Sequence, residues 1–165
     1  MSTENHVVAD FYARLWPWID HAQPMRVMLD DGGKGETATP DLCFQFVGSQ
    51  RELRIEFKVL EGGQITPTRK QLDTWGAGAN GPHLWIAKVP DEPHYLIWRH
   101  DDERFLAAFR ARAAKDTTRR SVAPPNQTRL RLPGVFAKLL AFAEAEGFLT
   151  QLNQRARFVI ALGTS

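Results

Sequence analysis

The sequence predicts an α/β fold in which a central mixed sheet is flanked by helices. Residues 53–59 alternate between apolar and charged side chains, which is the period of a strand with two different faces. Residues 83–89 are apolar on both faces, which is typical of a strand buried within a sheet. Residues 3–19 instead repeat apolar side chains at helical spacing. Both periods occur in one chain, so the sequence predicts strands covered by helices.

Composition sets the limits of this interpretation. A chain of 165 residues with 43% hydrophobic and 24% charged residues has the make-up of one globular domain with a real core. The net charge of +2 indicates that any surface for a polyanion is local. Cys43 is the only cysteine, which excludes an internal disulfide and a cysteine-based zinc site. No signal peptide or membrane span is visible, so we expect a cytoplasmic protein without a membrane partner.

The first half of the chain divides into one helix and three strands. Ser2 or Thr3 suits the N-cap of the first helix, and Pro24 precedes the next element. A strand over 25–30 is followed by a glycine-rich loop over 31–39. Strands over 42–47 and 53–59 are then joined by a hairpin turn at Gly48-Ser49-Gln50.

The next elements are a helix and two strands. Thr66-Pro67 predicts a helix start, with Thr66 as the N-cap, and Gly76 and Gly78 predict its end. The buried strand over 83–89 and a strand over 95–98 flank a turn at 90–93.

The remainder of the chain is predicted to be mainly helical. We expect a helix over 101–114, a basic surface loop over 115–131, a helix over 133–146 ended by Gly147, and a short strand over 158–162. The chain shows no clear linker. We therefore expect a single domain over residues 1–165, with a core over 1–98 and a C-terminal helical extension over 99–165.

The candidate site lies where two of these strands meet. Antiparallel pairing of 42–47 with 53–59 brings Asp41 close to Glu56 and Lys58. Two carboxylates and one ammonium can hold a divalent cation beside a scissile phosphate, because hard cations prefer oxygen ligands. We expect the three side-chain tips to share one solvent-reachable corner.

At this point the chain resembles a known family. Pro40-Asp41 followed by Glu56-x-Lys58 on the next strand resembles the PD-(D/E)XK nuclease superfamily. The turn after Lys58, the Thr-Pro helix start and Gln71 are similar to its virus-type replication-repair nuclease (VRR-NUC) branch. Gln71 and Trp75 also resemble the Gln-x-x-x-Tyr motif of the RecB-like branch, with Trp in place of Tyr. The resemblance covers residues 1–98.

The resemblance implies a restriction-endonuclease-like core with the order αβββαβ. It implies Mg²⁺ or Mn²⁺ held by Asp41, Glu56 and the backbone carbonyl of Phe57, with Lys58 orienting the attacking water. Gln71 would contact the metal shell or the nucleic acid. The implied activity is that of a metal-dependent endonuclease that hydrolyses phosphodiester bonds of DNA in replication, repair, recombination or defence.

Other residues allow two interpretations each. Glu4 either favours the helix dipole or serves as an additional metal ligand. Lys34, Arg69 and Lys70 flank the expected cleft and either contact phosphates or remain solvated. The basic loop over 115–131 either closes over a DNA backbone or is a solvated surface. Tryptophans at helical or strand spacing indicate a core, and His83, His94 and His100 lack metal-ligand spacing.

Two alternatives to an enzyme stay open. One is a non-catalytic nucleic-acid-binding module on the same fold. The other is a structural or partner-binding protein in which Arg54, Glu56 and Lys58 form an exposed ladder. The sequence also leaves open whether the protein is a monomer or a homodimer, although a twofold pair of sites would suit a substrate with two strands.

Overall fold

The structure is a computed structural model, and it describes residues 4–15, 25–29, 40–46, 51–76, 81–114 and 118–148. Within these ranges the elements occur in the predicted order of helix, three strands, helix and two strands, followed by two more helices. Their bounds are α1 (Glu4–Leu15), β1 (Met25–Leu29), β2 (Leu42–Phe46), β3 (Leu53–Val59), α2 (Arg69–Gly76), β4 (Leu84–Lys88), β5 (Tyr95–Arg99), α3 (Glu103–Ala114) and α4 (Leu132–Ala145). The predicted turn at 48–50 and the predicted strand at 158–162 lie outside the described residues.

The described strands form one mixed sheet with the order β1-β2-β3-β4-β5. Strands β3 and β4 are parallel, and the other neighbouring pairs are antiparallel. A parallel pair needs a crossover connection, and α2 supplies it between β3 and β4. The hairpin pairing of β2 with β3 is confirmed, with Leu42 opposite Ile55.

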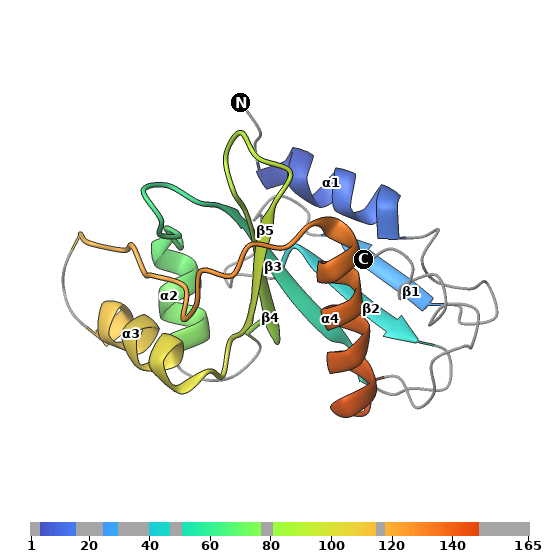
Figure 1. Ribbon diagram of the computed structural model, residues 1–165. Coiled ribbons are helices and arrows are strands. Elements are labelled where there is room, and N and C mark those ends of the chain that lie inside the picture. Colours follow the sequence, from blue (N-terminus) through green and yellow to red (C-terminus); the bar gives the residue numbers. More distant parts are fainter. Residues whose placement is uncertain are drawn as a thin grey trace.

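Helices cover the sheet on both sides (Figure 1). Helices α1 and α4 pack on one face, and their apolar side chains form a single buried cluster with Ile55 and Phe57 of β3. Helices α2 and α3 pack on the other face around Trp85 of β4. The predicted α/β architecture with a central mixed sheet is therefore confirmed, as three layers with the sheet in the middle.

Strand β3 is buried on both of its faces. The apolar face packs under α1, where the rings of Phe11 and Phe57 lie 5.1 Å apart. On the charged face, Glu56 is 1% exposed and Lys58 is 5% exposed. The expectation that these two side chains would lie in a solvent-reachable corner is wrong, because they lie on the face of the sheet against which α2 packs. Only Asp41, at the rim of the group, is half-buried.

The two C-terminal helices complete the two clusters. Phe105 and Phe109 of α3 are buried in the cluster around Trp85 of β4. The ring centroid of Phe136 in α4 lies 5.0 Å from that of Phe11 in α1. Gly147 ends α4 as predicted. Its φ is 79°, and the N–H of Phe148 donates to the carbonyl of Ala143 at 2.8 Å, which satisfies the last turn of the helix.

No described helix is both long enough and apolar enough to cross a membrane.

The basic loop is only partly the surface segment that the sequence predicts. Within 118–131, Val122 is 2% exposed and pairs with Ile65, and Leu130 pairs with Tyr95 at the edge of β5. The loop is thereby attached to the domain at two points. The prediction failed because backbone pairing between distant segments leaves no periodic pattern in so polar a stretch.

Gly76 is a packing constraint between α2 and α3. A Cβ at this position would lie 2.7 Å from the Cβ of Ala113, which is too close for two carbon atoms. We predict that Gly76→Ala lowers the free energy of unfolding by about 1–3 kcal/mol, the usual cost of overpacking. Urea denaturation measures the change. Gly134→Ala is the matched control, because its nearest contact of 3.5 Å is ordinary. Equal stability of the two variants would contradict the close approach.

Candidate active site

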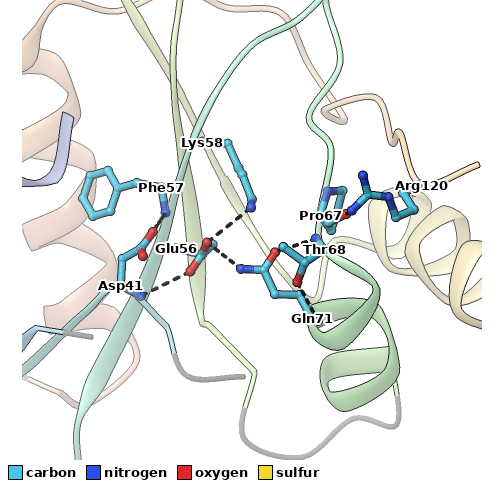
Figure 2. A network of polar contacts seen from close by, with 8 residues as sticks. All are labelled: Asp41, Glu56, Phe57, Lys58, Pro67, Thr68, Gln71 and Arg120. Carbon is cyan, nitrogen blue, oxygen red and sulfur yellow. Dashed lines mark hydrogen bonds and ion pairs between the residues drawn. The ribbon is translucent and has the colours of Figure 1, made fainter. Parts of the chain in front are cut away.

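A network of polar side chains joins the start of β2, the middle of β3 and the start of α2 (Figure 2). Asp41 precedes β2 and is the next residue in register opposite Glu56. The carboxylate Oδ2 of Asp41 accepts a hydrogen bond of 2.9 Å from the N–H of Phe57. The N–H of Asp41 donates to Oε1 of Glu56 at 3.2 Å. The structure thus brings Asp41 and Glu56 together as the strand pairing predicts.

Pro40 explains why a side chain replaces a backbone group as the hydrogen-bond partner of β3 at this point. Proline has no N–H, so the antiparallel hydrogen bonds cannot continue through it. The carboxylate of Asp41 accepts from the Phe57 N–H in place of a strand carbonyl. The N–H and C=O of one strand residue point to the same side, so the carbonyl of Phe57 also faces the beginning of β2. Asp41, Glu56 and the Phe57 carbonyl therefore border one region.

Glu56 is the most enclosed carboxylate of this group. Its Oε2 accepts a hydrogen bond of 3.0 Å from Nε2 of Gln71 and lies 3.6 Å from Nζ of Lys58. A buried carboxylate is costly unless it is paired and hydrogen-bonded. Donors from β2, β3 and α2 meet this requirement, and Figure 2 shows them converging on the Glu56 carboxylate.

Gln71 is oriented by a capping box at the start of α2. The N–H of Thr68 donates to Oε1 of Gln71 at 3.0 Å, and the N–H of Gln71 donates to Oγ1 of Thr68 at 3.0 Å. The amide oxygen of Gln71 must face Thr68, so its NH₂ group must face Glu56. The predicted start at Thr66-Pro67 is therefore wrong by two residues, since Thr68 is the N-cap. The pattern Thr68-x-x-Gln71 was the sequence signal for it.

The loop over 118–131 supports the same helix start. Arg120 donates from Nη1 to the carbonyl oxygen of Pro67 at 3.2 Å, and Oγ of Ser121 lies 3.3 Å from Oγ1 of Thr66. Figure 2 shows Arg120 beside the turn that leads into α2. One function of this loop is thus to position the helix that carries Gln71.

The oxygen atoms of this site fit a hard divalent cation. Mg²⁺ is commonly bound by one or two carboxylates, with waters and substrate phosphates as the remaining ligands. Asp41, Glu56 and the Phe57 carbonyl supply such a partial set. No group of three or more His, Cys, Asp or Glu side chains suited to a metal occurs among the described residues. A divalent cation bound here would therefore need water or substrate oxygens to complete its coordination shell.

The other predicted site residues lie elsewhere or outside the described side chains. Arg69 donates to the carbonyl oxygen of Arg112 at 3.2 Å and lies 3.6 Å from Asp73, so it joins α2 to α3. Lys70 is half-buried in the first turn of α2. Lys34 is outside the described residues, and Glu4 is described only as the first residue of α1.

The aromatic residues have the structural roles that the sequence predicts. Trp75, Trp85 and Trp98 are buried, while Trp16 and Trp18 lie outside the described residues.

Two of the predicted structural histidines accept hydrogen bonds inside the fold. His83 accepts through Nδ1 from the N–H of Arg54 at 3.0 Å, and His100 accepts through Nδ1 from the indole of Trp85 at 3.0 Å. Burial, then the charges of Arg54 and Arg51, lower the pKa of His83 to about 4. Burial is also the main cause that lowers the pKa of His100.

Comparison with known proteins identified no relative of this chain. No protein-family model, no curated protein and no solved structure matches it. The family resemblance of residues 1–98 therefore stays a prediction, and the candidate site rests on its own geometry.

The pairing of Lys58 with Glu56 has a measurable consequence. We predict that Lys58→Met lowers the free energy of unfolding by about 3 kcal/mol, because it leaves a buried carboxylate without its ammonium. Urea denaturation at neutral pH measures this loss.

The double variant Lys58→Met with Glu56→Gln should recover most of that stability, because it removes both charges. A double variant as unstable as Lys58→Met alone would show that the two charges are not coupled.

Proposed function

We propose that this protein is a metal-dependent nuclease of the PD-(D/E)XK type, with a restriction-endonuclease-like core closest to the VRR-NUC branch. Its substrate is DNA, cut internally by hydrolysis of phosphodiester bonds with Mg²⁺ or Mn²⁺. The observation that supports this most is the contact of Asp41 with Glu56 across β2 and β3, with Lys58 beside them. Two carboxylates beside one ammonium support the proposal, because hard divalent cations prefer oxygen ligands.

Each residue of the candidate site has its own role in the proposed reaction. Asp41 and Glu56 hold the cation, together with the carbonyl of Phe57. When bound, the cation supplies Lewis-acid stabilisation of the phosphoryl charge and acidifies the water that attacks. Lys58 places its positive charge where negative charge increases in the transition state. Gln71 keeps the Glu56 carboxylate in one orientation through its Nε2.

Burial argues against the purely structural alternative. An exposed charged ladder requires solvated side chains, but Glu56 is 1% exposed and Lys58 is 5% exposed. A protein that needed only a stable sheet would gain by replacing such a buried pair with apolar residues of similar volume. The presence of this buried pair therefore favours a chemical role over a purely structural one.

One observation favours a second candidate, a nucleic-acid-binding module that does not cleave. Both carboxylate oxygens of Glu56 accept hydrogen bonds within the protein, so the network is satisfied without a cation. Such a module would not couple nucleic-acid binding to Mg²⁺. The two candidates therefore differ in whether the cation binds at all.

Cation binding should stabilise the fold through Asp41. We predict that Mg²⁺ or Mn²⁺ at a hundred times its dissociation constant stabilises the wild type by about 2.7 kcal/mol. For a domain of this size that is a rise in Tm of about 5–10 °C. Thermal unfolding with and without cation measures it.

Asp41→Asn should lose most of this rise, because it removes one negative ligand. Glu103→Gln is the matched control, since Glu103 is an exposed carboxylate at the start of α3. A rise of equal size in Asp41→Asn and in Glu103→Gln would remove Asp41 from the metal site.

The cleavage rate should depend on Lys58 more strongly than the affinity for the cation does. We predict that Lys58→Ala reduces the cleavage rate by about a hundred- to a thousand-fold, the usual cost of removing one transition-state donor. The Tm rise with Mg²⁺ should persist. Rates are measured on linear, circular, single-stranded and junction DNA, and cleavage of circular DNA identifies an endonuclease.

Lys138→Ala is the control, because Lys138 is an exposed lysine on α4. A Lys58→Ala variant that cleaves like the wild type would exclude Lys58 from the mechanism. Wild-type protein that binds DNA but cleaves none of these substrates with either cation would favour the non-catalytic module.

A further inference from the structure

A second polar region lies where β3 and β4 begin and β5 ends. It is a pocket of about 310 Å³ that includes none of Asp41, Glu56, Lys58 or Gln71. The charged and imidazole side chains that line it are Arg51, Arg54, His83, Arg99, His100, Asp101 and Glu146. Three arginines face two carboxylates, so the pocket has an excess of positive charge.

Arg99 forms ion pairs with both carboxylates of the pocket, Asp101 and Glu146. Its Nε donates to Oδ1 of Asp101 at 2.7 Å and its Nη2 donates to Oδ2 of Asp101 at 3.0 Å. Its Nη1 donates to Oε1 of Glu146 at 2.8 Å. The hydrogen bond from Arg99 is the main cause that lowers the pKa of Asp101. Both carboxylates of the pocket are therefore paired with Arg99, and neither forms an ion pair with Arg54.

Arg54 is held in place without a carboxylate. Its Nε donates to the carbonyl oxygen of Gly81 at 2.8 Å, which fixes the guanidinium beside the start of β4. Among the described residues no Asp or Glu forms an ion pair with it. A half-buried guanidinium with a fixed orientation and no ion-pair partner in the described part of the chain is a suitable group for binding an anion.

His83 adds a second donor directed at the same space. Its Nδ1 accepts from the N–H of Arg54, so Nδ1 carries no proton. With a pKa of about 4 the ring is neutral at pH 7, so its proton must be on Nε2. Nε2 lies 3.4 Å from Nη2 of Arg54. Both atoms are donors, so this contact is not a hydrogen bond between them. An acceptor oxygen that reached both would satisfy them together.

We propose that this pocket is a phosphate-group site in which the guanidinium of Arg54 and the Nε2–H of His83 donate to the phosphate oxygens. Arg51, whose guanidinium lies 4.1 Å from the ring centroid of Phe148, adds positive charge at the exposed rim. The site needs no divalent cation and does not depend on the proposed nuclease activity. The phosphate group belongs either to a nucleic-acid backbone or to free phosphate, and these two sources share the chemistry that the pocket recognises.

The first test is a titration of the wild-type protein with inorganic phosphate in the absence of divalent cations. A ligand of so few atoms should bind with a dissociation constant of about 1 mM. Side-chain NMR resonances of His83 should shift to saturation. The pKa of His83 should also rise above about 4, because a bound anion favours the imidazolium form. Resonances of His83 that stay unchanged at about 10 mM phosphate would overturn the proposal.

Two variants test the donors and the charge. Arg54→Gln should weaken phosphate binding at least ten-fold, whereas Arg104→Gln, at an exposed arginine of α3, should leave it unchanged. Asp101→Asn should strengthen binding several-fold, because it removes a negative charge from the pocket wall. A gain in phosphate affinity cannot result from a damaged fold. Unchanged or weaker binding in Asp101→Asn would count against the site.

The source of the phosphate is identified by repeating the titration with a short single-stranded oligonucleotide and with Asp41→Asn. Shifts of His83 caused by the oligonucleotide in both proteins would assign the pocket to a nucleic-acid backbone. Shifts with inorganic phosphate alone would assign it to free phosphate. Neither result requires cleavage, so failure of this site and failure of the proposed nuclease are distinguishable.

Discussion

The buried carboxylate of Glu56 is the interaction on which the site depends. It accepts hydrogen bonds from the N–H of Asp41 and from Nε2 of Gln71, and it lies beside the ammonium of Lys58. These partners come from the residue before β2, from α2 and from β3. A charged group that is 1% exposed tolerates no missing partner, so three separate elements must meet at one point. The position of α2 and the residue that precedes β2 are therefore parts of the site as much as the carboxylate is.

Local pattern was enough to predict the strands and the contact of Asp41 with Glu56. The alternation of β3 fixes which of its residues share a face, and a short connection to β2 fixes antiparallel pairing. Asp41 then has to lie opposite Glu56. No long-range information entered that prediction, which is why the sequence alone could support it.

The failures arose where distant segments meet. The alternating charges of β3 suggest an exposed face, because nothing in the neighbouring sequence shows that helices pack on it. The helices on that side, α2 and α3, begin only at Arg69 and Glu103. The pairing of Val122 with Ile65 is equally invisible in a polar, proline-containing stretch. The N-cap of α2 is a different case, because the pattern Thr68-x-x-Gln71 lies in the local sequence beside the competing start signal Thr66-Pro67. Burial of charge is thus the feature that sequence patterns predict least well, and here it argues against an exposed charged ladder.

The geometry of β3 relates the two proposed sites to each other. Arg54, Glu56 and Lys58 alternate with apolar residues, so all three leave the same face of one strand. Successive residues on a face are about 6.6–6.8 Å apart, because each strand residue rises 3.3–3.4 Å. A strand bonded on both sides, to β2 and to β4, cannot change that spacing. If one backbone phosphate occupies the Arg54 pocket and another binds beside Glu56, the distance between them is set by the sheet and not by a flexible loop. The rigid strand would then select which phosphate along a bound nucleic-acid strand reaches the carboxylates.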